Sequence, residues 1–315
     1  MLQPQVKLAL THAEGWRRCA DSVTIGRNKR SMPMVRGRCL CGDIAFEVSA
    51  DIGMVTHCHC SMCRKFHGSA FSTHGVVPAD GIEWLTGQGL VRRYASSPGG
   101  ARPFCRRCGS NVPSDHMPGF IIVPLGNLDD DPLARPLADI FVGSKAPWYD
   151  IAGDLPRFDA YPPGFDGSAL PDPIREPAPA GHVRGSCLCG RVAYAIEGKI
   201  ELIRHCHCGR CRRARSAAHA TNGFVEPARF RFLRGEDLLE SFKVPDAERF
   251  TQTFCRECGS PMPRSVPNRP YVVVPMGGVE GEPGSRPREH IFVGSKAPWY
   301  EIADALPQHA EYGPA

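Results

Sequence analysis

Short stretches of alternating polar and apolar residues, separated by glycine and proline, dominate the chain after its N-terminal segment. Residues 43–48 and 191–196 alternate with a period of two, which is typical of half-buried β-strands. The apolar runs at 120–124 and 271–275 have the length of inner strands. One short helix is predicted near residues 64–67, with a counterpart in the second half, and no long amphipathic helix. The pattern therefore predicts a mostly β protein.

The same motifs occur twice in the same order, which indicates an internal repeat. Equivalent positions are 148 residues apart at the first two cysteine motifs, 150 at the third, and 151 where residues 140–149 recur letter for letter as 291–300. We expect a first domain over 35–161 and a second over 183–312. The segment between them, 162–182, is rich in Pro, Gly and Asp and is predicted to be a linker.

The first 34 residues are basic and polar, show no periodicity, and are predicted to be disordered. Residues 1–38 carry a charge balance of +6 within a total of +5, so the rest of the chain sums to −1. A basic groove for nucleic acid is therefore not expected outside this tail. Cys19 is interpreted as a spare thiol, and Met32 or Met34 as a possible alternative start of the native product.

Composition predicts a folded protein of two domains, since the chain has 315 residues, 42% of them hydrophobic and 23% charged. No run approaches the roughly 20 apolar residues of a membrane-spanning helix, and the first residues lack the apolar core of a secretory signal. We therefore expect a cytoplasmic protein without a membrane partner. In that compartment, closely spaced cysteines are more often metal ligands than disulfides.

Seven cysteines in three motifs recur in each half. In the first half the motifs are Cys39-x-Cys41-Gly42, His57-Cys58-His59-Cys60-x-x-Cys63 and Phe104-Cys105-x-x-Cys108-Gly109. The corresponding cysteines of the second half are Cys187, Cys189, Cys206, Cys208, Cys211, Cys255 and Cys258.

The seven cysteines divide naturally into four and three. The first and third motifs are short clips followed by glycine, which permits the tight turn that aims two sulfurs at one ion. Together they offer four thiolates, the ligand set of a closed structural zinc site. The middle motif offers three, and a zinc with three protein ligands keeps one position open, as catalytic zinc does.

Spacing alone leaves other arrangements open. Cys60-x-x-Cys63 could pair with Cys105-x-x-Cys108 as a zinc ribbon, or a nearby histidine could close the triplet into a second structural site. An iron–sulfur cluster fits less well, because no familiar cluster spacing is present.

These three motifs, with the distal Trp148, resemble the glutathione-dependent formaldehyde-activating enzyme and centromere protein V family over both halves. The resemblance implies a β-tent of small antiparallel sheets pinned by zinc in each half. It also implies that Cys39, Cys41, Cys105 and Cys108 hold a structural zinc and that Cys58, Cys60 and Cys63 are active-site ligands. With the second half, the expected content is about four zinc ions per chain.

The activity that the resemblance implies is that of a carbon–sulfur lyase of the S-(hydroxymethyl)glutathione synthase type. Its partners would be a small-molecule thiol, similar to glutathione, and a small aldehyde. An open three-thiolate zinc suits this chemistry, because it can hold an incoming thiol as the nucleophilic thiolate. The alternatives are a non-catalytic zinc-stabilised binding module and a thiol or redox sensor.

Three further residues are candidates for the catalytic site. His59 lies between two ligands and could shuttle a proton, or simply form a hydrogen bond within the turn. Gly68 and Ser69 could form a tight turn beside the metal with backbone donors for an anion. The second half has Ser216 and Ala217 there, so we predict a different backbone path and weaker activity for that half.

Two residues of the repeated decapeptide have both a functional and a structural interpretation. Lys145 could bind a substrate carboxylate, or lie on the surface. Trp148 could line the pocket, or pack in the core, and the same holds for its counterpart Trp299. Phe104 is interpreted as a core residue.

Overall fold

The computed structural model describes residues 34–162, 176–266 and 268–313. The predicted disordered tail with Cys19 and most of the predicted linker lie outside these residues. Below, the first unit denotes residues 35–161 and the second unit residues 183–312. Among the helices of the described ranges, none combines the length and the apolar content that crossing a bilayer requires.

The first unit contains three small sheets and one helix. The sheets have the strand orders β1-β2-β5, β11-β10-β3-β4-β9-β8 and β6-β7. Their strands are β1 Val35–Arg38, β2 Ala45–Val48, β3 Gly53–Cys58, β4 Ser72–Pro78, β5 Ile82–Thr86, β6 Val91–Ser97, β7 Gly100–Cys105, β8 Ser114–Met117, β9 Phe120–Pro124, β10 Ala138–Ile140 and β11 Arg157–Phe158. The helix α2 spans Ser61–His67.

The second unit repeats this plan. Its sheets have the orders β16-β13-β12-β21, β19-β20-β15-β14-β22 and β17-β18. Their strands are β12 His182–Ser186, β13 Ala193–Glu197, β14 Leu202–Cys206, β15 Ala220–Val225, β16 Phe230–Arg234, β17 Leu239–Lys243, β18 Thr251–Cys255, β19 Arg264–Ser265, β20 Val272–Pro275, β21 Val279–Glu280 and β22 His290–Ile291. The helix α3 spans Gly209–Arg215.

The mostly β class predicted from the sequence is confirmed, as are the four strands predicted within it, which appear as β2, β9, β13 and β20. The predicted start of the first helix, near residue 64, was wrong. Helix α2 begins at Ser61 and contains Cys63, rather than following it. Cys60 caps the helix, since its sulfur accepts a hydrogen bond from the Cys63 amide, in the way that a serine oxygen does at other helix starts.

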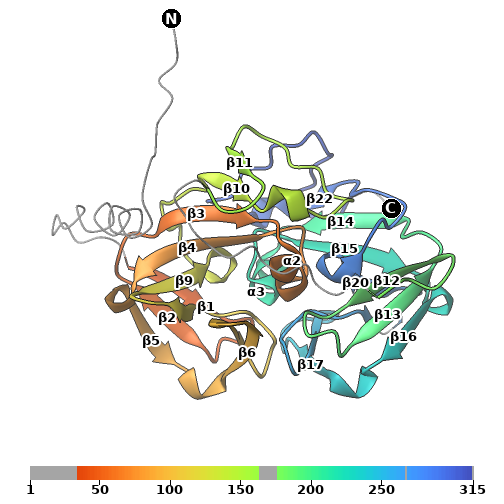
Figure 1. Cartoon of the computed structure of the whole chain (residues 1–315), viewed down its shortest axis with the longest axis horizontal. Helices are drawn as coiled ribbons and strands as arrows, with labels where there is room; N and C mark the ends of the chain where they lie inside the picture. The colour runs from red at the N-terminus through yellow and green to blue at the C-terminus, as the bar shows by residue number, and fades with distance from the viewer. Residues whose placement is uncertain (1–33, 163–175, 267, 314–315) are drawn as a thin grey trace, which may run out of the picture.

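The two units pack against each other reciprocally, with α2 and α3 between them in the centre of the molecule (Figure 1). Helix α2 contacts the second unit's 3₁₀ turn η7 (Met276–Gly278), and α3 contacts the first unit's η3 (Leu125–Asn127). The rings of Phe104 and Phe254 meet edge to face, 6.4 Å apart between centroids, and each lies over a glycine of the other unit. The arrangement is that of a pseudo-twofold pair.

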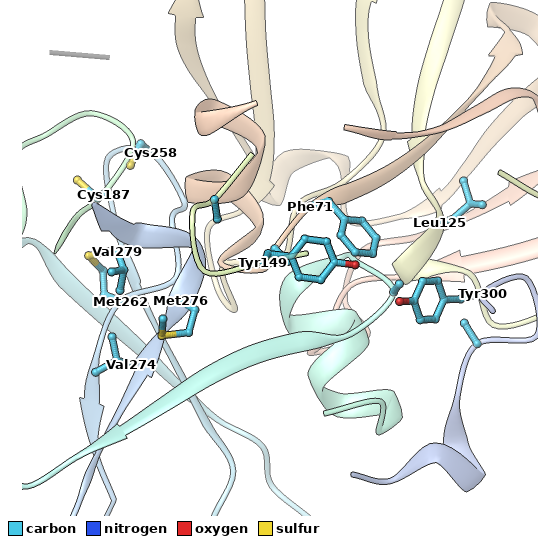
Figure 2. Packing of buried hydrophobic residues seen from close by; sticks show 14 of the residues in the cluster. Phe71, Leu125, Tyr149, Cys187, Cys258, Met262, Val274, Met276, Val279 and Tyr300 are labelled. Atoms are coloured by element: carbon cyan, nitrogen blue, oxygen red, sulfur yellow. The ribbon is translucent and has the colours of Figure 1, made fainter. Parts of the chain in front are cut away.

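Aromatic residues from both units also meet in the buried core. Figure 2 shows Tyr149 of the first unit and Tyr300 of the second beside Phe71, and the ring centroid of Phe71 lies 5.6 Å and 6.0 Å from theirs. The same buried cluster contains apolar residues of both units, including Val123 and Val274. The two units therefore share one buried apolar cluster, whose burial stabilises their association.

Candidate functional site

Four cysteines of the first unit gather in one buried cluster. The sulfurs of Cys39, Cys41, Cys105 and Cys108 all lie within 4.8 Å of one another. Cys39 and Cys41 are 3.3 Å apart and Cys41 and Cys105 3.8 Å. A tetrahedral zinc with bonds of about 2.3 Å separates its sulfurs by about 3.8 Å, so the donor set fits zinc. The second unit has the same cluster, made of Cys187, Cys189, Cys255 and Cys258.

The backbone of these clips has the turn that the sequence predicts. Gly42 and Gly109 have φ of 81° and 73°, in the left-handed region that glycine adopts at little cost. The amide of Ile44 donates to the Cys39 sulfur at 3.4 Å. Amide donors of this kind stabilise a thiolate, the form in which cysteine binds a metal.

The remaining cysteines form two triplets. The sulfurs of Cys58, Cys60 and Cys63 lie within 4.8 Å of one another, at the junction of β3 and α2. Cys206, Cys208 and Cys211 form the same group between β14 and α3. Among the residues that the structure describes, no histidine or carboxylate joins either triplet as a fourth donor. The structure thus groups the sulfurs four and three in each unit, and does not form the ribbon pairing of Cys60 and Cys63 with Cys105 and Cys108.

A cavity of about 560 Å³ opens over the first triplet. All three cysteines of the triplet line it, together with apolar side chains, three imidazoles and one guanidinium. These side chains include Phe66, His67, His74, Arg102, His116 and Phe141. The volume suits a small-molecule ligand.

Arg102 comes into this cavity from β7. Its Nη1 donates to the Cys63 sulfur at 3.7 Å, and its guanidinium carbon lies 5.5 Å from the centre of the Phe66 ring. Burial by itself would lower the pKa of Arg102, but the neighbouring sulfurs of Cys63 and Cys60 outweigh it and raise that pKa. The cation and the sulfur group therefore stabilise each other.

The three thiols of the triplet do not share charge equally. Hydrogen bonds from Cys58 and Cys60, with Arg102 close by, lower the pKa of Cys63 well below its ordinary value. In the second triplet, hydrogen bonds from Cys206 and Cys211 lower the pKa of Cys208 to about 3. Each triplet thus holds at least one thiolate at neutral pH, as metal binding requires.

Two histidines of the cavity wall connect it to the other unit. His67 Nδ1 lies 2.7 Å from the carbonyl oxygen of Arg215, and His67 Nε2 lies 3.2 Å from His74 Nε2. Because a carbonyl only accepts, His67 carries its proton on Nδ1 and accepts from His74 at Nε2. Burial lowers the pKa of His67 to about 3 and that of His74 to about 4. Both imidazoles are therefore neutral at physiological pH.

His59 lies next to the triplet but is not part of the cavity wall. Its ring is fully buried, and Nε2 is 2.7 Å from the Asp139 carboxylate, while Nδ1 has no partner. The equivalent His207 contacts His290, which in turn contacts Asp304. The structure thus holds both imidazoles in the domain core, behind the ligands.

Gly68 and Ser69 lie at the boundary between the units and do not line the cavity. Gly68 ends α2 in the left-handed conformation, with its α-carbon against Pro261 of the second unit. The Ser69 hydroxyl donates to the His219 carbonyl oxygen at 2.7 Å. The structure therefore places these two residues in packing between units.

The prediction of a different backbone path at Ser216 was wrong. Ser216 has φ 49° and ψ 38°, close to the 61° and 28° of Gly68, and ends its helix in the same way. Its hydroxyl donates to the Asn111 carbonyl oxygen of the first unit at 2.9 Å. This hydrogen bond offsets the roughly 1 kcal/mol or more that a non-glycine residue loses in the left-handed region.

Lys145 and Trp148 have structural positions. The Lys145 ammonium donates to the Tyr149 carbonyl oxygen at 2.9 Å and does not line the cavity, while Trp148 is fully buried. Phe104 is fully buried as well, in agreement with its interpretation as a core residue.

Sequence reasoning missed the cavity residues outside the cysteine motifs, chiefly Arg102, His67 and His74. A comparison of the two halves contained a signal for them. Arg102 corresponds to Gln252, and His67 to Arg215, so the halves differ here within otherwise matching motifs.

Small sheets that carry two cysteine clusters in each half, one of four and one of three, define a class of proteins in which each unit has two groups of thiols that could hold a metal. The family model for the glutathione-dependent formaldehyde-activating enzyme matches residues 34–144 and 182–295. The chain belongs to this family, as a tandem member.

Individual relatives match shorter stretches. An uncharacterized lyase of Schizosaccharomyces pombe is 30% identical over 81 residues, which cover 26% of this chain and 57% of that lyase. A Rhodobacter sphaeroides protein of known crystal structure is 26% identical, with a TM-score of 0.28, and the match covers 33% of this chain and 97% of that one.

Proposed function

We propose that the protein is a zinc-dependent carbon–sulfur lyase-type enzyme that acts on adducts of a thiol and a small aldehyde, with the first unit's cavity as its active site. One observation carries the proposal. The three sulfurs of Cys58, Cys60 and Cys63 line a cavity, whereas Cys39, Cys41, Cys105 and Cys108 do not line it. Membership of the formaldehyde-activating enzyme family and the lyase relative support the same reaction class.

The proposed zinc content is about four ions per chain, one in each cysteine cluster. Zinc on three thiolates would keep one position for an incoming thiol and hold it as the thiolate. The four-cysteine clusters would hold structural zinc, since their four sulfurs complete a tetrahedral set.

The chain's own residues prepare the cavity for this reaction. Its apolar wall, which includes Phe66 and Phe141, limits water around the reacting groups. The thiol sulfur forms a bond to the aldehyde carbon, and the π electrons of the carbonyl move to its oxygen. The proton lost by the thiol returns to that oxygen from solvent. The reverse reaction breaks the same carbon–sulfur bond.

His59, Gly68 and Ser69 are proposed as positioning residues rather than as groups that touch substrate. His59 holds the turn between Cys58 and Cys60 through its contact with Asp139. Gly68 and Ser69 fix the end of α2 against the second unit.

The test is a screen of purified, zinc-replete protein against pairs of thiols and small aldehydes, with adduct formation and breakdown followed by NMR. We expect at least one pair to react faster than its uncatalysed rate, and removal of the labile zinc to abolish the difference. If no pair reacts faster while the protein retains its zinc, the enzyme proposal fails and a binding module is favoured.

A further inference from the structure

Arg102 is the fixed positive charge of the first cavity. The described lining of this cavity contains no Asp, Glu or Lys. Besides Arg102, the side chains of the lining that can carry a positive charge are His67, His74 and His116. Burial lowers the pKa of all three histidines, to about 3 for His67 and about 4 for His74. The guanidinium is thus the group in this wall that attracts an anion at neutral pH.

The donors of Arg102 are largely unused by the protein. A guanidinium has five N–H donors, and here Nη1 points to the Cys63 sulfur while the buried Nε has no acceptor. By contrast, Arg93 on the neighbouring strand β6 binds the Asp115 carboxylate with both terminal nitrogens. No carboxylate or amide oxygen of the described residues is bonded to Arg102, so its guanidinium, which lines the cavity, has donors for an anion bound there.

The buried Arg215, beside the triplet of the second unit, is held by the protein. Arg215 stands at the position of His67, and its Nη1 lies 3.0 Å from Gln252 Oε1. Its Nη2 lies 3.3 Å from Asn222 Oδ1. Gln252 and Asn222 occupy the positions of Arg102 and His74. Although the Arg215 Nε also lacks a partner, both terminal nitrogens, which form the fork that binds oxyanions, are occupied.

We propose that Arg102 is the oxyanion-binding catalytic residue of the first site. It would hold the negatively charged oxygen that forms beside Cys63 when a thiol sulfur adds to an aldehyde carbon and the carbonyl π electrons move to oxygen. The assignment of the reaction rests on the proposed function, but anion binding by Arg102 does not. Donors fixed in advance at such an oxygen typically raise the rate by about 10²–10³-fold.

The binding test compares two thiols of similar size, thioglycolate and 2-mercaptoethanol, which carry a carboxylate and a hydroxyl near the sulfur. Each is titrated calorimetrically into the zinc-replete full chain at fixed ionic strength. We expect the wild type to bind thioglycolate about tenfold more tightly than 2-mercaptoethanol at one site, as a charge-assisted hydrogen bond predicts. Arg102→Gln should lose this preference and Arg102→Lys should keep part of it.

Arg93→Gln is the matched control, since it removes one positive charge near the cavity without changing the cavity wall. It should keep the preference. Zinc content, measured for every variant, shows whether the triplet is intact, and Arg102→Lys serves if Arg102→Gln does not fold. Equal affinity of the wild type for both thiols, or an unchanged preference in Arg102→Gln, overturns the proposal.

Turnover separates this inference from the proposed function. If Arg102 determines the thioglycolate preference but no aldehyde reacts, the reaction is wrong and the anion site remains. If the wild type is active, Arg102→Gln should lower kcat about 10²-fold or more. An unchanged kcat in that variant overturns the oxyanion role.

Discussion

The Lys65 ammonium of the first unit lies 2.5 Å from the Glu280 carboxylate of the second, and both side chains are more than nine-tenths buried. Ser186 also contacts both partners, at 2.6 Å each. The pseudo-twofold counterpart is the ion pair of Arg213 with Asp129, which is about one-fifth exposed. Helices α2 and α3 thus each carry a basic residue that forms an ion pair with an acidic residue of the other unit.

The Lys65 pair should stabilise the contact between units strongly. We expect Lys65→Met to lower the free energy of unfolding by about 1.5–3 kcal/mol, because it removes a buried charge-assisted hydrogen bond and leaves Glu280 with Arg184 as its cation. Arg213→Met, the matched variant at the more exposed pair, should cost about 1 kcal/mol or less. Chemical denaturation measures both, and equal losses would contradict the ranking.

Metal analysis should find about four zinc ions in the reduced chain. Two should be held tightly by four sulfurs each, and two should be removed by a chelator, because each triplet lacks a fourth protein ligand. Elemental analysis before and after chelator treatment measures this difference. One or two ions in total, none of them labile, would contradict the open-site arrangement.

Serine substitutions should separate the two kinds of cluster. Structural zinc contributes on the order of 10 kcal/mol to folding, so Cys105→Ser should give insoluble or misfolded protein. Cys60→Ser should remain folded, with one labile zinc fewer. Circular dichroism and solubility distinguish them, and similar behaviour of the two variants would refute the assignment of roles.

Turnover, where present, should depend mainly on the first unit. Cys60→Ser should abolish thiol–aldehyde chemistry, whereas Cys208→Ser should leave most of it. The reason is that Arg102 lines the first unit's cavity beside Cys63, whereas the corresponding residue of the second unit is the neutral Gln252. Initial rates for both variants decide the matter. Equal losses would indicate twin or shared sites, and a loss only in Cys208→Ser would reverse the ranking.

Acid should destabilise the protein in part through His67. Burial lowers its folded-state pKa to about 3, below the roughly 6.5 of an unfolded histidine. Between these values the unfolded chain binds a proton that the folded one does not. His67 therefore leaves the free energy of unfolding unchanged above about pH 6.5, and lowers it progressively as the pH falls from 6.5 toward 3.

His67→Gln keeps an N–H donor for the Arg215 carbonyl and cannot be protonated. It should lose about 2 kcal/mol less unfolding free energy than the wild type between pH 7.5 and pH 5. Denaturation at the two pH values measures the difference, and an identical pH dependence in both proteins would contradict a buried neutral His67.

The sequence predicted the fold class, because alternation with a period of two marks a strand. Spacing suggested a division of the cysteines into four and three but left other pairings of the motifs open, and the resemblance to the family implied this division. Arg102 was missed because β7 brings it to Cys63 across 39 residues of sequence. The path at Ser216 was mispredicted because a hydroxyl contact to Asn111, in the other unit, compensates the conformation. Such compensation is set by tertiary structure.

The pseudo-twofold arrangement gives this chain an evolutionary freedom that a pair of identical subunits lacks. In a homodimer every substitution appears at both sites, so an arginine could not be exchanged for glutamine at one while being retained at the other. Covalent fusion removes this constraint. In the second unit, Gln252 and Arg215 occupy the positions of Arg102 and His67. The arginine therefore comes from helix α3 in the second unit and from strand β7 in the first. Duplication has thus let one site change while the interface that both units need was preserved.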